Sequence, residues 1–133
     1  MTDERTILFV CVHNAGRSRM AEAFFNELAG DGYRAVSAGT EPATAAHPEV
    51  VEAMARRGIP LRDGPGSLLT GEMADQAERV VGMGCNVEEA CPALRVPLED
   101  WELEDPKGKG RAGVDRIRDE IERRVKALIE QLG

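Results

Sequence analysis

The sequence predicts an α/β fold with a four-stranded parallel β-sheet, on three observations. Short apolar runs alternate with helical patterns along the 133 residues, which is typical of parallel sheets. The first run, residues 6–12, is apolar without alternation, as expected for a strand buried on both faces. The end of the chain carries an apolar stripe at helical spacing: Val114, Ile117, Ile121, Val125, Leu128 and Leu132.

The first half of the chain is expected to hold two strands and two helices. After the first strand, a helix begins at residue 18, where apolar residues recur at helical spacing, and it ends at Gly30. Residues 33–38 are rich in strand formers and predict a second strand. A second helix begins at Pro48, since proline suits the first turn of a helix, and ends at Gly58.

The second half is less regular before its final helix. Residues 59–71 hold three glycines and two prolines, which predicts a loop. A short helical piece at 72–77 leads into a third strand at 79–83, and a short fourth strand is expected at 94–98. Residues 99–113 are charged and glycine-rich and are expected to form a loop. No linker or internal repeat interrupts the chain, so we expect one domain, residues 1–133.

The composition excludes several classes of protein. The net charge of −7 argues against nucleic acid as a partner, because phosphate backbones favour basic surfaces. No apolar stretch approaches the length of about 20 residues that a membrane helix needs, so we expect no membrane partner. The start of the chain does not resemble a secretory signal. An odd number of cysteines, three, fits poorly with a secreted disulfide framework. We therefore expect a cytoplasmic protein with reduced thiols.

Residues 11–18, Cys-Val-His-Asn-Ala-Gly-Arg-Ser, join the first strand to the first helix. The N–H groups of such a loop and the positive end of the next helix converge on one small volume that binds anions. Arg17 adds a two-pronged donor for a tetrahedral anion, and these positive surroundings favour Cys11 as a nucleophilic thiolate. The expected oxyanion-binding residues are Val12, His13, Asn14, Ala15, Gly16, Arg17 and Ser18.

Two more reactive side chains follow predicted strands. Cys85 comes just after the third strand, and Asp105 lies in the loop after the fourth. The carboxyl ends of parallel strands meet at one edge of a sheet, where functional groups gather. Cys11, Cys85 and Asp105 therefore converge if the first and third strands are neighbours, which the sequence leaves open.

Four motifs carry a family resemblance: residues 11–22, residues 37–39, the pair Cys85 and Cys91, and Trp101 with residues 104–106. With these motifs the chain resembles the low-molecular-weight tyrosine phosphatase family over nearly its whole length. Within that family it resembles the arsenate reductases that use protein thiols. The first motif is shared with the phosphatases, and the cysteine pair points to arsenate. The resemblance implies a three-layer sandwich, with helices on both sides of the sheet.

The resemblance also implies a relay of three thiols. Cys11 attacks arsenate while Arg17 and the loop hold the adduct, and Asp105 protonates the leaving oxygen. Cys85 then attacks Cys11, and arsenite leaves. Cys91 takes over the disulfide, which thioredoxin or a low-molecular-weight thiol reduces. The residues agree with this scheme, because a dithiol that becomes a disulfide supplies two electrons. No glycine fingerprint for a flavin or nicotinamide occurs, so no bound cofactor is expected.

The spacing of the second and third cysteines has a mechanical consequence. Cys85 and Cys91 are six residues apart, about 9 Å along a regular helix. Bridged cysteines have Cα atoms within about 7 Å of each other. A helical segment 85–91 must therefore unwind or bend to form the bridge, and we predict that it is the most mobile part of the chain.

Several of these residues also have purely structural interpretations. The Asp105-Pro106 pair is also a common turn starter. Ser18 is either a helix cap or a hydrogen-bond donor to the Cys11 thiolate. Asn14 tolerates strained loop conformations, which agrees with a role in organising the loop. Trp101 is expected to pack in the core rather than to line the substrate.

Two alternative functions remain. A tyrosine phosphatase needs only Cys11, Arg17 and Asp105, but aromatic residues, which such enzymes place around the pocket, make up only 4% of the chain. We expect weak phosphatase activity and competition by phosphate and sulfate. The other alternative is a non-catalytic protein, either a zinc module or an anion-binding sensor. A zinc module would use Cys11, Cys85, Cys91 and His13, whose spacing lacks the close pairs typical of zinc sites.

Three further expectations follow from the resemblance and the composition. No metal is expected, because in similar proteins that bind potassium near the loop an aspartate stands at the place of Ser67. Gly16 stands where many thioredoxin-coupled members carry another cysteine, which is not one of the three relay thiols. This version of the loop also resembles members served by low-molecular-weight thiols, whereas the Cys85 and Cys91 pair favours thioredoxin. The chain gives no signal for oligomerisation, and we expect a monomer.

Overall fold

The computed structural model describes residues 5–30, 32–61, 64–83, 98–101, 103–104, 106 and 108–132. In chain order the elements are β1 (Arg5–Cys11), α1 (Arg17–Leu28), β2 (Tyr33–Gly39), α2 (Pro48–Arg56), α3 (Gly71–Gln76), β3 (Ala77–Gly82), β4 (Leu98–Asp100) and α5 (Gly110–Leu132). Strands and helices alternate as the sequence predicts, and the bounds of the first six elements agree with prediction within two residues.

The four strands form one parallel sheet in the order β2-β1-β3-β4. The apolar β1 is central, with β2 on one side and β3 on the other, which satisfies its burial on both faces. The first and third strands are therefore adjacent in the sheet, a point that the sequence left open. Because all strands are parallel, their carboxyl ends meet at one edge.

Two predicted boundaries in the second half are wrong. The strand predicted at 94–98 is described only from Leu98, and it continues to Asp100, inside the predicted loop. Glu99 is compatible with this position because β4 is an edge strand, where charge is tolerated, and it pairs with Arg79 on β3 at 2.9 Å. Helix α5 also begins inside that predicted loop, at Gly110. The apolar stripe did not reveal this start, because the exposed first turn contributes no apolar residue to the stripe.

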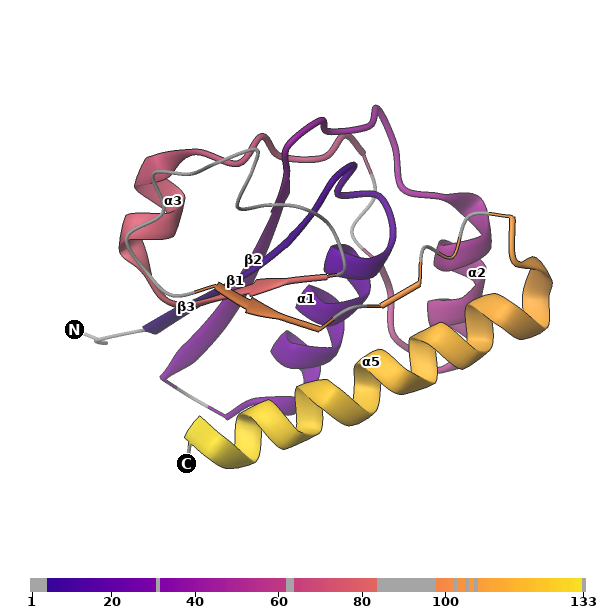
Figure 1. The fold of residues 1–133 in the computed structure, drawn as a ribbon. Helices are drawn as coiled ribbons and strands as arrows, with labels where there is room; N and C mark the ends of the chain where they lie inside the picture. Colours follow the sequence, from indigo (N-terminus) through magenta and orange to yellow (C-terminus); the bar gives the residue numbers. More distant parts are fainter. Residues whose placement is uncertain are drawn as a thin grey trace.

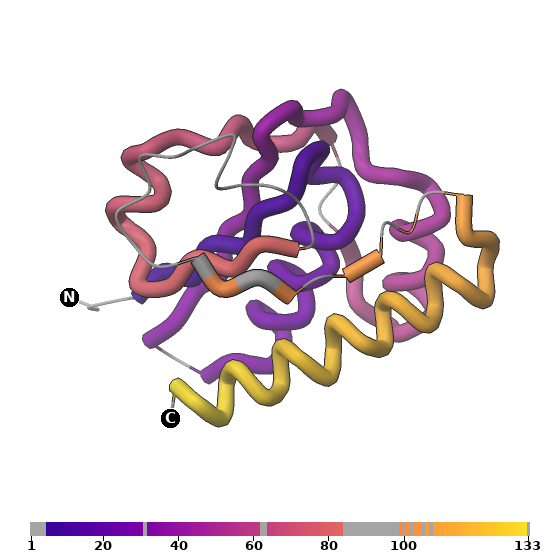
Figure 2. Tube along the Cα trace, in the orientation of Figure 1, coloured from indigo at the N-terminus to yellow at the C-terminus, as the bar shows by residue number. Residues whose placement is uncertain are grey.

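Helices cover both faces of the sheet, as Figure 1 shows. Ile7 and Phe9 of β1 face α1, α2 and α5 in the larger core, whereas Leu8 and Val10 face α3 in the smaller one. Helix α5 starts beside α2 and runs past α1, as Figure 2 shows, and it contacts both of these helices. The predicted sandwich of helices, parallel sheet and helix is thus confirmed.

Trp101, which follows β4, is a core residue as expected. Its side chain is 6% exposed, and its ring lies 5.7 Å from that of Phe9 between centroids. Among the described residues, no helix combines the length and the apolar character needed to cross a bilayer.

Candidate active site

The loop between β1 and α1 leaves the sheet at its centre. Cys11, the last residue of β1, is in register with Gly39 of β2, and the preceding Val10 is in register with Gly82 of β3. The loop residues 12–16 therefore lie at the carboxyl edge, flanked by the ends of both neighbouring strands. This is the position at which parallel α/β sheets bind their ligands.

The loop curves around the Cys11 sulfur, and its carbonyl groups point away from this concave side. Each of six consecutive carbonyl oxygens accepts a hydrogen bond from outside the concave side: Cys11 from Thr40 N (3.3 Å), Val12 from Glu41 N (2.8 Å), His13 from Ala43 N (2.8 Å), Asn14 from Arg19 Nε (2.5 Å), Ala15 from His47 N (2.9 Å) and Gly16 from Met20 N (3.0 Å). In a planar trans peptide the N–H points away from the C=O. The next N–H in each case therefore faces the concave side, which gives the predicted cradle for an oxyanion.

Cys11 is buried, 3% exposed, and its sulfur has two hydrogen-bond partners. The Asn14 backbone N–H donates to Sγ at 3.2 Å, and the Ser18 Oγ lies 2.9 Å from it. Ser18 Oγ itself accepts a hydrogen bond from Asn14 Nδ2 at 2.7 Å. The orientation of the Asn14 amide is fixed by the Ser67 N–H, which donates to Asn14 Oδ1 at 2.9 Å. The Ser18 hydroxyl hydrogen is thus available for the sulfur, and it stabilises a thiolate.

The geometry of Ser18 and Asn14 resolves two open interpretations. Ser18 lies within α1 and bonds the thiol, while the N-cap position, Gly16, makes no side-chain cap hydrogen bond. Asn14 has φ 49°, and among the described residues it is the one non-glycine in the left-handed region. Both side chains therefore organise the loop around the sulfur.

Two glycines outside the loop allow this close packing. A Cβ on Gly39 would lie 2.5 Å from the Val12 carbonyl oxygen, and one on Gly66 would lie 3.0 Å from the Asn14 Cβ. Gly39 belongs to one of the sequence motifs, but Gly66 lies in a segment that the sequence marks only as a loop. Its role depends on a contact distant in sequence and has no local signal.

Arg17 is held at the edge of the sheet by two carbonyl groups. Its Nη1 donates to the Met83 oxygen at 2.7 Å and to the Leu103 oxygen at 3.0 Å, and the residue is 9% exposed. These carbonyls follow β3 and β4 respectively. The guanidinium is therefore oriented before any anion binds, which reduces the entropy lost on binding.

A small pocket opens over the sulfur, with a cavity volume of about 10 Å³. Its lining residues are Cys11, His13, Ala15, Gly16, Arg17, His47 and Pro106. His13, Ala15, Gly16 and Arg17 were predicted to bind the oxyanion, while Val12, Asn14 and Ser18 support the loop without lining the pocket. His47 was not predicted to take part. It reaches the pocket because its backbone N–H bonds the Ala15 carbonyl, a contact distant in sequence.

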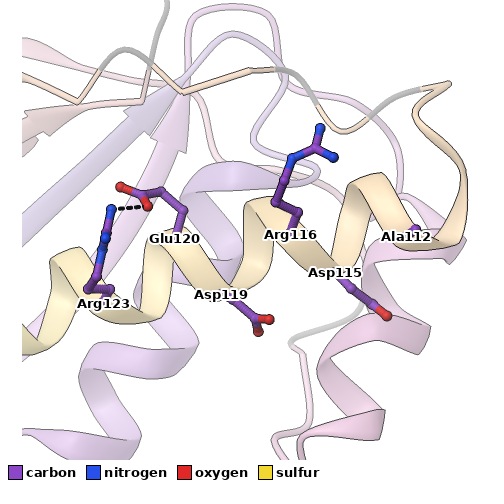
Figure 3. A pocket seen from close by; sticks show the side chains of 6 residues that line it. All are labelled: Ala112, Asp115, Arg116, Asp119, Glu120 and Arg123. Atoms are coloured by element: carbon purple, nitrogen blue, oxygen red, sulfur yellow. Dashed lines mark hydrogen bonds and ion pairs between the residues drawn. The ribbon is translucent and has the colours of Figure 1, made fainter.

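A second hollow lies along α5 and includes none of the loop residues. Figure 3 shows its lining, which comes from one face of a single helix: Ala112, Asp115, Arg116, Asp119, Glu120 and Arg123. Its charged side chains are already paired. Glu120 pairs with Arg123 inside the hollow, whereas Asp115 pairs with Arg56 and Arg116 with Glu104, both outside it. It is an open charged surface rather than a site with converging reactive groups.

Cys85, Cys91 and Asp105 lie outside the described residues. Two described residues near them in the sequence are Met83, two before Cys85, whose carbonyl contacts Arg17, and Pro106, directly after Asp105, which lines the pocket. Within the described part of the chain, no three His, Cys, Asp or Glu side chains converge to hold a metal. Two of the four ligands considered for zinc are not described, so the structure does not test that set.

The fold and the loop together define a class of protein. The chain belongs to the low molecular weight phosphotyrosine protein phosphatase family, whose model matches residues 6–133.

Similar proteins within this family include reductases and phosphatases. Arsenate reductase 1 of Staphylococcus haemolyticus is 33% identical over 132 residues, which cover 98% of each chain. The thioredoxin-dependent arsenate reductase of Corynebacterium glutamicum has a TM-score of 0.80 and 34% identity, over 98% of this chain and 64% of that one. The arginine phosphatase of Geobacillus stearothermophilus has a TM-score of 0.85 and 26% identity, over 96% and 92% of the two chains.

Proposed function

We propose that this protein reduces arsenate to arsenite, with Cys11 as the nucleophile and thioredoxin as the electron donor. The observation that carries the proposal is the buried Cys11 sulfur, hydrogen-bonded by Ser18 and Asn14 in a pocket lined by Arg17. Arsenate is a tetrahedral oxyanion of the kind that such a pocket binds. The similarity to arsenate reductases at 33% identity over 98% of the chain supports the same substrate.

In the first step the Cys11 thiolate attacks the arsenic atom of bound arsenate. A sulfur–arsenic bond forms, and one arsenic–oxygen bond breaks. The oxygen leaves as water after it receives a proton, for which Asp105 is the proposed donor. Arsenic remains pentavalent in this step. Arg17 and the inward N–H groups of the loop stabilise the negative charge of the adduct.

In the second step the thiolate of Cys85 attacks the Cys11 sulfur. The new disulfide takes one sulfur from each cysteine, and the electron pair of the sulfur–arsenic bond stays on arsenic, which leaves as trivalent arsenite. Two thiols have then lost two electrons, as the reaction requires. Cys91 next attacks Cys85, which releases the Cys11 thiolate and leaves a Cys85–Cys91 disulfide for the dithiol of thioredoxin.

The chain connectivity supports the second step. Cys85 comes two residues after Met83, whose carbonyl oxygen lies 2.7 Å from Nη1 of Arg17. Two residues of extended chain span only about 7 Å. The length of chain between Met83 and Cys85 therefore keeps Cys85 within reach of the Arg17 side of the pocket, as the proposed exchange with Cys11 requires.

The remaining parts of the proposal concern partners and setting. Thioredoxin is the proposed reductant because of the Cys85 and Cys91 pair and the similarity to a thioredoxin-dependent reductase. A low-molecular-weight thiol is the alternative reductant. Phosphate and sulfate compete for the pocket, and no bound cofactor takes part. We propose a monomeric single domain, residues 1–133, that works in the cytoplasm, where its thiols are reduced.

A phosphatase is the second candidate, favoured by the similarity to an arginine phosphatase with a TM-score of 0.85. It would use Cys11 as nucleophile, Arg17 as anion donor and Asp105 as acid, with no role for the other two thiols. The arsenate reductases match at higher identity, which makes phosphatase activity the weaker candidate.

The test separates these two reactions in one protein. Arsenite production is measured with thioredoxin, thioredoxin reductase and NADPH for the wild type, Cys85→Ser and Cys91→Ser. Hydrolysis of an aryl phosphate is measured in parallel. We expect no arsenite from Cys85→Ser and at most one arsenite per protein molecule, without further turnover, from Cys91→Ser, while the weak hydrolysis survives in both. Equal loss of both activities, or a wild type that forms no arsenite, would overturn the reductase.

A further inference from the structure

Arg19 is a buried cation in the first turn of α1, and the sequence motifs give it no role. It is 1% exposed and is among the largest fully buried side chains of the described residues. Burial of a guanidinium is unfavourable unless its donors are satisfied. A cation near a helix N-terminus is also unfavourable with respect to the helix dipole. Two unfavourable terms at one residue indicate a compensating interaction.

That interaction is with the backbone of the oxyanion loop. Arg19 Nε donates to the Asn14 carbonyl oxygen at 2.5 Å, and Nη2 donates to the Gly64 carbonyl oxygen at 2.7 Å. The guanidinium thus connects the loop to the segment that contains Gly66 and Ser67, which itself packs on Asn14. A planar fork with donors in fixed directions suits this bridge better than an ammonium does.

Asn14 differs from the other loop residues in how its carbonyl is held. The carbonyl oxygens of residues 11–13, 15 and 16 all accept hydrogen bonds from backbone N–H groups, whereas that of Asn14 accepts from a side chain. Asn14 also has a φ of 49°, a sparsely populated conformation that persists only where the surrounding contacts hold it. Because the peptide is planar and trans, the direction of the Asn14 carbonyl fixes the direction of the Ala15 N–H.

We propose that Arg19 is a positioning residue of the oxyanion loop. It holds the Asn14 carbonyl outward and thereby directs the Ala15 N–H toward the bound anion. Without this contact the Asn14–Ala15 peptide can turn, which replaces a donor in the pocket by a carbonyl oxygen that repels anions. The proposal rests on the proposed function only in that arsenate is the natural anion, because inorganic phosphate tests it without any redox step.

The test compares two buried arginines. Arg118 is 8% exposed and donates to the Ala53 carbonyl oxygen at 2.9 Å between α5 and α2, so Arg118→Met is the matched control for Arg19→Met. Binding of inorganic phosphate is measured by calorimetry on folded protein, and the Ala15 amide signal is followed by NMR during the titration. We expect the dissociation constant to rise about tenfold or more in Arg19→Met, with loss of the phosphate-induced Ala15 shift, and to be unchanged in Arg118→Met.

Arg19→Lys keeps the positive charge but loses the planar guanidinium. This variant serves as the test of the proposal if Arg19→Met does not fold. We expect weaker phosphate binding and a reduced Ala15 shift in this variant as well. Wild-type affinity and a wild-type Ala15 shift in a folded Arg19 variant would overturn the proposal, as would equal loss in Arg118→Met. If the wild type binds phosphate as expected but forms no arsenite, the proposed function fails and the role of Arg19 stands.

Discussion

The start of α1 differs from the starts of α2 and α3. Helix α3 has a Thr70 cap whose hydroxyl accepts from the Met73 N–H at 3.1 Å, and Glu72 lies in its first turn. Helix α2 has proline in its first turn together with Glu49. Both patterns stabilise a helix N-terminus through a satisfied donor or a favourable charge.

Helix α1 has neither of these features. Gly16 makes no side-chain cap hydrogen bond, and no acidic residue lies in the first turn. Two arginines, Arg17 and Arg19, are buried there instead. In the proposed function, the N-terminal donors and the positive dipole of α1 act on the bound anion instead. The N-terminus of α1 therefore differs from those of α2 and α3 by the absence of a cap, a proline and an acidic residue in its first turn.

The largest expected effect comes from Arg17, the proposed anion donor at the N-terminus of α1. Arg17→Lys keeps a positive charge but loses the two-pronged geometry. We expect kcat/KM for arsenate to fall by about 10² to 10³. Arg116→Lys on the exposed face of α5 is the control and should leave kcat/KM unchanged. A small effect of Arg17→Lys would mean that charge alone binds the anion.

The second effect comes from giving α1 the cap that it lacks. Gly16→Asp places a carboxylate at the N-cap, where it satisfies the helix donors but repels the anion. We expect phosphate affinity to fall by about 100-fold, while the neutral Gly16→Asn retains most of it. The two side chains are nearly equal in size, and a Cβ at residue 16 would lie 3.2 Å from Cγ of Pro106 in either variant. Equal losses in calorimetric titrations would indicate a steric cause and contradict the electrostatic one.

The third effect concerns the thiolate. Ser18→Ala removes the hydroxyl 2.9 Å from the Cys11 sulfur. We expect alkylation of Cys11 by iodoacetamide at neutral pH, and arsenate turnover, to slow by about tenfold. Ser67→Ala is the matched control, because Ser67 bonds Asn14 through its backbone N–H, which the variant keeps. An unchanged alkylation rate in Ser18→Ala would show that the hydroxyl does not stabilise the thiolate.

The fourth effect reports the ordinary helix end. Thr70→Ala removes the cap of α3, and we expect the free energy of unfolding to fall by about 1 kcal/mol in urea titrations. Phosphate affinity should stay at its wild-type value, because Thr70 is not among the residues that line the pocket and its hydroxyl accepts from α3. A loss of affinity would mean that the two helix ends are coupled.

The smallest effect is a pH dependence far from the pocket. A hydrogen bond from Arg56 of α2 lowers the pKa of Asp115 on α5 below its ordinary value of 3.8. Because the pKa is lower in the folded state, the stabilisation is present above the ordinary value and is lost as the pH falls through the folded value. Arg56→Gln should lower the free energy of unfolding by at most about 1 kcal/mol at neutral pH. Denaturant titrations in strong acid should show no difference between variant and wild type, and a difference that persists there would contradict this origin.

Much of the fold could be predicted because its signals are local. The apolar run of β1 and the stripe of α5 depend on burial patterns that the sequence shows directly. The edge strand β4 was misplaced because Glu99 gains its partner, Arg79, only across the sheet. That Cys11, Arg17 and Ser18 come together at one loop was also predictable, since they lie within eight residues.

The parts of the site that escaped prediction depend on contacts between distant residues. Gly66 and His47 acquire their roles only when their segments pack on the loop. Arg19 lies inside the most informative motif, but a basic residue in a first turn gives no sign that it will be buried against a carbonyl oxygen. Such roles follow from tertiary packing rather than from local pattern.

The three-thiol relay is tested by the disulfide that forms when Cys91→Ser is exposed to arsenate without a reductant. Peptide mass spectrometry identifies the bridged cysteines, and released arsenite is measured in the same sample. The relay predicts one Cys11–Cys85 bond for each arsenite released. Release of arsenite with no bond between these two sulfurs, or a bridged protein with no arsenite, would contradict it.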